Sequence, residues 1–199
     1  MANTVRKSTL DRRDVIKTLL APRGDALLVT GLGSSCYDAG TLDHPNNFYL
    51  WGGMGGAAMI GLGLAIAQPK RRVLVVTGDG EMLMGLGSLA TIAAEKIRNL
   101  TIVVIDNELY SETGMQPTHT ARGVDLAGMA KAAGFALTGT VTTQQDLKTW
   151  VPKLYTTPGP VLMDLKVNAN RYPLSIRLRD GPHIKNRFRE ALLGAKAFD

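Results

Sequence analysis

The stretch 72–81, Arg-Val-Leu-Val-Val-Thr-Gly-Asp-Gly-Glu, decides the fold class of this chain, and the stretch 100–107, Leu-Thr-Ile-Val-Val-Ile-Asp-Asn, repeats its pattern. Each begins as an apolar run, rich in β-branched residues and without polar alternation, which is typical of a strand buried on both faces of a sheet. Each then changes to polar residues at the point where the strand should stop. The sequence therefore predicts two parallel strands with polar residues at their carboxyl ends.

The rest of the chain alternates between extended and helical patterns. This alternation predicts an α/β fold, a doubly wound parallel sheet flanked by helices, with residues 1–199 forming a single domain. The glycine-rich, small-residued helix at 53–67 should be buried and closely packed. The other expected strands are 26–30, 48–51, 135–141 and 160–167, and the other expected helices are 10–20, 82–97, 125–133, 143–154 and 184–193.

Composition limits the classes of partner. The chain has 199 residues, of which 45% are hydrophobic and 20% charged, as expected for a folded domain with a sizeable core. Its net charge of +6 does not indicate nucleic acid, because the basic residues are dispersed and aromatic residues, at 6%, are too few for stacking on bases. A positive surface also suits an anionic cofactor and an anionic substrate.

The termini and the cysteine content bear on the compartment. No apolar run reaches the roughly 18 residues of a membrane span, and the first residues lack the apolar core of a secretory signal. The single cysteine, Cys36, excludes an internal disulfide and a four-cysteine metal site, and it is expected to be a small buried hydrophobe. We expect a cytoplasmic protein without a membrane partner.

The polar ends of the two strands predict a binding site. If the strands are neighbours, Asp79 and Asn107 converge, and a carboxylate, an amide and a nearby backbone carbonyl suit Mg²⁺ or Ca²⁺. Gly78 and Gly80 let the backbone approach a bulky anion, and a helix beginning near Glu81 directs free N–H groups at it. Metal, glycine turn and helix start together predict a diphosphate anchor. The simpler alternative is that Asp79 and Asn107 only form turns or caps.

The pairing of Gly78-Asp79-Gly80 with Asn107 resembles the two-part signature of thiamine-diphosphate enzymes. The resemblance implies that thiamine diphosphate and Mg²⁺ are the cofactors. It also implies that Asp79, Asn107 and the backbone oxygen of Leu109 are the metal ligands.

An upstream run supports the same resemblance. Residues 51–58, Trp-Gly-Gly-Met-Gly-Gly-Ala-Ala, are similar to a Gly-x-Met-Gly run of that family. The resemblance implies that Met54 separates the two rings of the cofactor and enforces its bent shape, and that Gly52, beside Gly53, accepts a hydrogen bond from the aminopyrimidine through its carbonyl. The alternative for Met54 is an ordinary core methionine.

The segment 110–118, Tyr-Ser-Glu-Thr-Gly-Met-Gln-Pro-Thr, resembles sulfopyruvate and phosphonopyruvate decarboxylases, as do 48–73 and 87–107. The similarity implies decarboxylation of an anionic 3-substituted pyruvate, a 2-oxoacid, to an aldehyde and CO₂. Gly56 and Met115 depart from the pattern of some relatives, so the particular 2-oxoacid is left open. Tyr110 and Ser111 are expected at the cofactor. Met54 is expected to act at the cofactor rings. The residues expected to act on substrate at the pocket mouth are Ser111, Thr113, Gln116 and His119.

The resemblance also implies a partner. In this family the glutamate that activates the cofactor belongs to a separate pyrimidine-binding module, and none of the glutamates of this chain lies in such a module. A pyrimidine-binding partner subunit should supply that glutamate, in a hetero-oligomer of at least two of each chain. The basic and apolar segment 177–193 either docks on a neighbouring subunit or packs on its own sheet.

Several alternatives remain open. Residues 31–36, Gly-Leu-Gly-Ser-Ser-Cys, begin like a dinucleotide-binding motif but have Cys36 where that motif has glycine, so a tight turn into a helix explains them better. A carboligase of the acetolactate-synthase type would use the same cofactor site. A 2-oxoacid oxidoreductase subunit normally needs iron–sulfur clusters, for which this chain has no cysteine cluster. A non-catalytic, cofactor-binding regulatory subunit is the remaining possibility.

Overall fold

A computed structural model describes residues 8–50, 52–175 and 180–198. Its main sheet has six strands, all parallel, in the order β2-β1-β3-β4-β8-β7, which confirms the predicted α/β architecture. A short antiparallel pair, β5 (Leu109–Tyr110) and β6 (Gln116–Pro117), lies outside it. The strands of the main sheet are β1 (Leu27–Thr30), β2 (Asn47–Tyr49), β3 (Val73–Gly78), β4 (Leu100–Asp106), β7 (Leu137–Val141) and β8 (Val161–Lys166).

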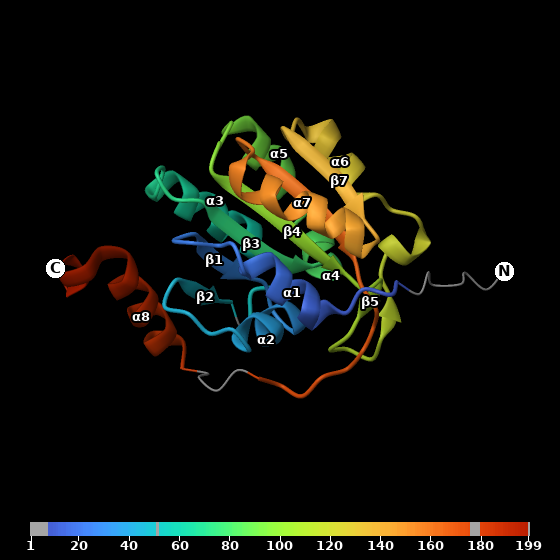
Figure 1. The fold of residues 1–199 in the computed structure, drawn as a ribbon, viewed down its shortest axis with the longest axis horizontal. Helices are drawn as coiled ribbons and strands as arrows, with labels where there is room; N and C mark the ends of the chain where they lie inside the picture. The colour runs from blue at the N-terminus through green and yellow to red at the C-terminus, as the bar shows by residue number, and fades with distance from the viewer. Residues whose placement is uncertain (1–7, 51, 176–179, 199) are drawn as a thin grey trace.

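Helices cover both faces of the sheet (Figure 1). One apolar cluster joins the sheet to α1, α2 and α7, and a second cluster on the other face joins it to α3, α4, α5 and α6. Successive residues of β1, such as Leu28 and Val29, belong to opposite clusters, as the pleat of a strand requires. The helices are α1 (Arg12–Leu20), α2 (Ser34–Gly40), α3 (Ala57–Ala67), α4 (Asp79–Met84), α5 (Ser88–Ala94), α6 (Leu126–Ala133), α7 (Gln144–Thr156) and α8 (Gly181–Leu193), with short 3₁₀ turns η1 (Thr120–Arg122) and η2 (Gly194–Phe198).

Local signals explain several helix boundaries. Asp11 and Thr143 accept hydrogen bonds from backbone N–H groups at the starts of α1 and α7, and Asp125 does the same for α6. Gly134 ends α6 in the left-handed conformation, which glycine adopts at little cost. These boundaries agree with the sequence predictions to within two residues.

The pairing of β3 with β4 positions the candidate site. The two strands are parallel neighbours, and Gly78 lies opposite Ile105. Asp79 and Asn107 therefore follow adjacent strands at the same edge of the sheet, as predicted. This edge, beyond the carboxyl ends of the strands, is where open α/β sheets bind ligands.

Two predicted helices differ from the structure at a glycine contact. The segment 82–97 forms two helices, α4 and α5, and the helix expected at 53–67 begins only at Ala57. The backbones of Gly55 and Gly85 abut, since a Cβ atom on Gly85 would lie 2.3 Å from the Gly55 carbonyl oxygen. Gly55 has φ +89°, so it cannot continue a right-handed helix. Of the expected strand 48–51, Trp51 lies outside the described residues.

The C-terminal helix packs on its own chain. Ile184 and Phe188 of α8 are buried, and the Phe188 ring centroid lies 5.5 Å from that of Phe48 on β2. Arg187 adds two hydrogen bonds to Asp43, of 2.7 and 3.1 Å. α8 lies beside β2, at the edge of the sheet opposite β7 (Figure 1). Of the two possibilities for this segment, the structure thus favours packing on its own sheet; residues 177–179 lie outside the description.

None of the helices in the described residues is long and apolar enough to cross a bilayer.

Candidate functional site at the carboxyl edge of the sheet

A cleft of about 160 Å³ opens beyond the ends of β1, β3 and β4. Eight of its lining residues belong to the predicted site, and the others come mainly from the turn after β1. The predicted residues are Met54, Gly80, Glu81, Asn107, Leu109, Tyr110, Ser111 and Thr113, and the additional ones are Arg12, Leu32, Gly33, Ser34, Ser35, Ile105 and Glu112.

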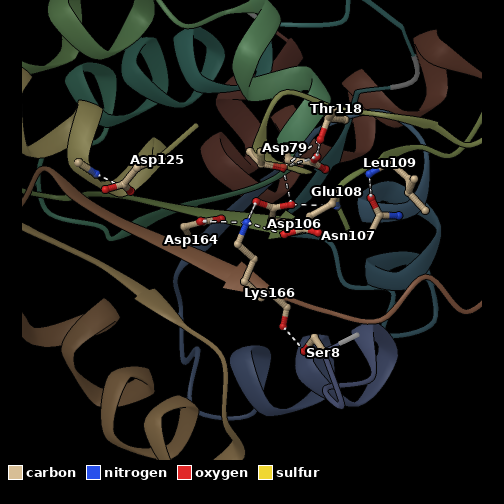
Figure 2. Close-up of polar contacts among 12 residues, drawn as sticks. Ser8, Asp79, Asp106, Asn107, Glu108, Leu109, Thr118, Asp125, Asp164 and Lys166 are labelled. Atoms are coloured by element: carbon tan, nitrogen blue, oxygen red, sulfur yellow. Dashed lines mark hydrogen bonds and ion pairs between the residues drawn. The ribbon is translucent and has the colours of Figure 1, made fainter. Parts of the chain in front are cut away.

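Asp79, the first residue of α4 and the neighbour of the cleft-lining Gly80, is almost wholly buried, and Figure 2 shows it beside Thr118 and Asp106. Its Oδ2 accepts hydrogen bonds from Thr118 Oγ1 at 2.6 Å and Thr120 Oγ1 at 3.2 Å. Burial, followed by the nearby charge of Asp106, raises the pKa of Asp79 to about 7. A carboxylate whose charge is so poorly solvated gains much from a cation beside it.

A second buried carboxylate, Asp106, adjoins Asp79. Its Oδ2 accepts a hydrogen bond from Lys166 Nζ at 2.6 Å, and its Oδ1 accepts one from Thr120 Oγ1 at 2.9 Å. Burial, together with the charge of Asp106, raises the pKa of Asp164 to about 8. Burial lowers the pKa of Lys166, but three neighbouring carboxylates outweigh that effect and the net shift is upward. This end of the site is therefore rich in negative charge, with one ammonium group to offset it.

The loop after β4 holds the other predicted metal ligands. Asn107 Oδ1 accepts a hydrogen bond from the Leu109 N–H at 3.0 Å, and its Nδ2 donates to Ser111 Oγ at 2.8 Å. Glu108, between them, has φ +63°, a conformation that is costly for a non-glycine residue. The loop is thus bent sharply, which brings the side chain of Asn107 and the backbone of Leu109 close together.

Glu81 lines the cleft, yet its carboxylate is turned towards the turn after β1. Oε2 accepts a hydrogen bond from the Leu32 N–H at 3.0 Å, and a Cβ atom at Gly31 would lie 1.8 Å from that oxygen. Burial raises the pKa of the Glu81 carboxyl. Gly31 is therefore required for close packing against a carboxylate, which gives this glycine a role other than binding a dinucleotide.

Met54 is not a core methionine in this chain. Its side chain is 37% exposed and lines the cleft, on a loop shaped by Gly53 and Gly55 at positive φ. At Gly52 and Gly53 an added Cβ atom would meet open space. Gly52 and Gly53 are exposed like Met54, so this loop is left uncovered by the chain.

The residues expected at the pocket mouth separate into two groups. Thr113 lines the cleft, and it is tied to Gln116 through hydrogen bonds of 2.9 Å to Oε1 and 2.8 Å from Nε2 to the Thr113 carbonyl. Gln116 and His119 are exposed, and His119 precedes η1. Both lie outside the set of residues that line the cleft, as do Gly52, Gly53, Gly78 and Asp79.

The turn after β1 contributes to the cleft, which the sequence pattern did not indicate. Gly33 and Ser34 line the cleft because β1 pairs directly with β3, so its carboxyl end meets the same edge. Both strands were predicted, at 26–30 and 72–77, but the sequence pattern of neither strand shows that the two are adjacent in the sheet. Arg12 was also missed, since only tertiary packing brings α1 to the cleft.

The donor set fits a hard divalent cation. It would consist of one carboxylate from Asp79, the amide oxygen of Asn107 and the backbone oxygen of Leu109, all oxygen atoms of the kind that Mg²⁺ prefers. In the described part of the chain, no cluster of three or more His, Cys, Asp or Glu side chains is arranged to hold a metal ion. A site there would depend on the amide and the backbone in addition to Asp79.

Comparisons with known proteins identify the family of this chain. Residues 31–165 match the family model "Thiamine pyrophosphate enzyme, C-terminal TPP binding domain". The chain is 35% identical to sulfopyruvate decarboxylase subunit beta of Methanothermobacter thermautotrophicus, over 94% of this chain and 97% of that one. It is 38% identical to phosphonopyruvate decarboxylase of Streptomyces hygroscopicus, over 83% of this chain but only 41% of that protein. The structure of benzoylformate decarboxylase from Polynucleobacter necessarius shares the fold, with a TM-score of 0.71 at 21% identity, covering 86% of this chain and 35% of that one.

Proposed function

The chain belongs to the thiamine pyrophosphate enzymes, whose C-terminal TPP-binding domain it contains, and we propose that it is the diphosphate-binding subunit of a heteromeric 2-oxoacid decarboxylase. Its substrate would be an anionic 3-substituted pyruvate of the sulfopyruvate or phosphonopyruvate kind, converted to an aldehyde and CO₂. The observation that carries the proposal is the match over nearly the whole length of a decarboxylase subunit, combined with a cleft at the expected edge of the sheet. Residues 1–199 would act as one domain.

The buried end of the cleft would hold the diphosphate and Mg²⁺. Asp79, Asn107 and the Leu109 backbone oxygen would bind the cation. Gly78, Gly80 and the first N–H groups of α4, including that of Glu81, would face the phosphate oxygens. Tyr110 and Ser111 follow on the same loop and would close over them. The bound thiamine diphosphate supplies an electron sink for the electron pair released when CO₂ leaves.

The exposed end of the cleft would take the two rings. Met54 would hold them in a bent arrangement, because a thioether is soft enough to contact two aromatic planes. The Gly52 carbonyl, on the same loop, would accept a hydrogen bond from the aminopyrimidine. Gly53 leaves open space beside them. These groups orient the cofactor and exclude water, and they transfer no proton.

The segment from Ser111 to His119 would select the substrate. The Ser111 and Thr113 hydroxyls line the cleft, and Gln116 fixes Thr113 through two hydrogen bonds. Hydroxyl and amide donors can bind a sulfonate or a phosphonate. His119 is exposed near the same loop and could add a donor for the second anionic group.

The activating glutamate would come from a partner. Two carboxyl groups, Glu81 and Glu112, are among the described residues that line the cleft. Glu81 is committed to the Leu32 N–H, while Glu112 is exposed and lies near Gly33. The partner would therefore be a pyrimidine-binding subunit that presents a glutamate from the open side, in an assembly of at least two of each chain.

The outer face of α3 would be the docking surface for that partner. α3 has no charged residue and is apolar all round, and a helix of that kind is normally covered on every side. This helix was expected to be buried, but the chain covers only the side that carries Ala58, Leu62 and Ala65. The large apolar side chains left 37% to 68% exposed here, which we call the open apolar face, are Met54, Met59, Ile60, Ile66 and Met84.

The open apolar face is continuous with the cleft, which favours the partner over an unrelated ligand. Met54 belongs to both, and the Gly55–Gly85 contact joins its loop to the end of α4, where Met84 lies. A subunit seated on this face would reach the ring end of the cleft directly. The additional length of the phosphonopyruvate decarboxylase, of which this chain covers 41%, agrees with a second module attached there in longer relatives.

Reconstitution tests the function. The chain with thiamine diphosphate and Mg²⁺ should release no CO₂ from sulfopyruvate or phosphonopyruvate, and activity should appear when the partner is added and saturate at a fixed ratio. Sustained turnover by the chain alone would contradict the split site, and Glu112→Gln would then show whether Glu112 replaces the partner's glutamate. A carboligase would give a longer-chain hydroxyketoacid in place of the aldehyde. A regulatory subunit would bind cofactor without turnover.

A further inference from the structure

Asp106 is linked by hydrogen bonds to both parts of the proposed metal site, to Asp79 through Thr120 and to the loop 107–109 through the Glu108 N–H, although it is not itself a proposed ligand. We propose that Asp106 is a positioning residue that holds all three metal ligands in place, and that Lys166 in turn holds Asp106. The inference rests on the proposed function, because it concerns how the chain prepares the cation site. Figure 2 shows Asp106 between Asp79, the loop 107–109 and Lys166.

The first contact runs from Asp106 to Asp79 through Thr120. Thr120 Oγ1 lies 2.9 Å from Asp106 Oδ1, 3.2 Å from Asp79 Oδ2 and 2.9 Å from Thr118 Oγ1. A hydroxyl has a single proton to donate, so Asp106 and Asp79 share that of Thr120. Thr118 donates to the same oxygen of Asp79, at 2.6 Å. Both hydroxyls thus fix Oδ2, which sets the orientation of the whole carboxylate.

The second contact runs from Asp106 to the loop that carries the other two ligands. Asp106 Oδ1 accepts a hydrogen bond from the Glu108 N–H at 2.9 Å. Glu108 has φ +63°, and donation of its N–H to the carboxylate of an aspartate two residues earlier stabilises such a bend. Asn107 and Leu109 flank Glu108, so the direction of the Asn107 side chain and of the Leu109 carbonyl depends on this bend.

Lys166 fixes Asp106 from the opposite side. Its Nζ lies 2.6 Å from Asp106 Oδ2, 3.3 Å from Glu108 Oε1 and 3.9 Å from Asp164 Oδ2. Asp106 Oδ2 therefore faces the ammonium group, and Oδ1 faces the ligands. Because one ammonium group offsets only part of the surrounding negative charge, the site keeps a net attraction for a divalent cation.

Binding of Mn²⁺ as a probe tests the positioning role directly. We would titrate the full chain with Mn²⁺ in the presence of thiamine diphosphate, following free Mn²⁺ by electron paramagnetic resonance. Asp106→Asn and Asp106→Ala should each weaken Mn²⁺ binding at least tenfold. Thr120→Val, which removes only the first contact, should weaken it about threefold to tenfold, and Thr120→Ser should restore it. Leu147→Ala, a buried truncation on α7 away from the site, is the control for lost stability and should leave binding within twofold.

Hydrogen exchange of the cation-free chain separates the two contacts. The Glu108 amide should exchange much faster in Asp106→Ala than in the unmodified chain, and it should stay protected in Thr120→Val. If the unmodified chain binds no Mn²⁺, the proposed function fails and this inference fails with it. If it binds Mn²⁺ while Asp106→Asn and Thr120→Val stay within twofold, only the positioning role is overturned. Should the Asp106 variants not fold, the Thr120 pair decides.

Discussion

The two ends of the cleft are built in opposite ways. At the proposed diphosphate end, Asp79 and Asp106 are buried, and hydrogen bonds from within the chain hold both side chains. At the proposed ring end, Met54 and the other residues of the open apolar face are exposed. The chain thus completes the polar half of the site by itself and leaves the apolar half uncovered.

The difference follows from the chemistry of each half. A buried carboxylate without partners costs several kcal/mol, so the diphosphate end needs its threonines and lysine before any ligand binds. An exposed methionine or isoleucine costs far less, and its burial by a partner contributes roughly 1.5–3 kcal/mol per side chain. The polar half is therefore stabilised within this chain, and the apolar half is the one for which we propose an interface.

Loss of Asp79 should have the largest effect, because it removes the carboxylate of the donor set. Asp79→Ala should weaken cation-dependent binding of thiamine diphosphate by at least a hundredfold, about 2.7 kcal/mol or more. Isothermal titration with and without Mg²⁺ measures this. Asp43→Asn, at an aspartate that pairs with Arg187 of α8 and lies outside the residues lining the cleft, is the control. Affinity near that of the unmodified chain in Asp79→Ala would remove the metal assignment.

Charged residues placed on the open apolar face should weaken association with the proposed partner. Ile66→Lys combined with Met59→Lys should weaken association with the partner by about a hundredfold, because two ammonium groups would have to be desolvated in the interface. Met129→Lys, on a similarly exposed methionine of α6, is the control and should leave association unchanged. Analytical ultracentrifugation of the mixed chains gives the affinity. If Met129→Lys weakens association as much as the double variant does, or if the double variant still assembles, the partner docks elsewhere.

The sequence predicted the features that depend on consecutive residues and missed those that depend on contacts between distant residues. The strands 72–77 and 100–106 and the positions of Asp79 and Asn107 follow from local pattern, since apolar runs and polar strand ends are written in consecutive residues. The break between α4 and α5 was missed because it depends on the Gly55–Gly85 contact, which joins residues far apart in sequence. The hydrogen bond between Thr120 and Asp106 was missed for the same reason, because a residue at the end of β4 and a residue of η1 meet only in the folded chain.

Met54 tests the ring end without touching the diphosphate end. Met54→Ala should lower kcat of the reconstituted enzyme about tenfold, roughly 1.4 kcal/mol, while the affinity for thiamine diphosphate changes less than threefold. Because Met54 is already exposed, the unfolding free energy of the isolated chain should stay within about 0.5 kcal/mol. Met129→Ala, at a similarly exposed methionine outside both the cleft and the open apolar face, is the control for kcat. An unchanged kcat together with a large loss of unfolding free energy would mean that Met54 serves only in packing.

The buried carboxyls of the diphosphate end predict a pH dependence that the ring end cannot produce. Asp164 has its pKa raised to about 8, so between about pH 4 and 8 the folded chain holds a proton that the unfolded chain releases. The contribution of this group to stability is therefore greatest at low pH and falls as pH rises towards 8. Asp164→Asn removes it, and the loss of unfolding free energy between pH 7 and 8 should shrink by roughly 1 kcal/mol. Urea titrations at the two pH values measure this, and an identical pH slope in both chains would contradict it.

The smallest expected effect lies where the two ends meet, at the loop 111–119. Gln116→Ala frees Thr113 by removing both of its hydrogen bonds, and Thr113→Val removes the hydroxyl itself. Each should raise KM for sulfopyruvate or phosphonopyruvate about threefold, roughly 0.7 kcal/mol, and leave KM for pyruvate unchanged, because pyruvate lacks the second anionic group. His119→Gln, at an exposed residue outside the cleft lining, shows whether the anionic group reaches further along the loop. Equal changes for both substrates would mean that this loop shapes the cleft without reading the charge of the substrate.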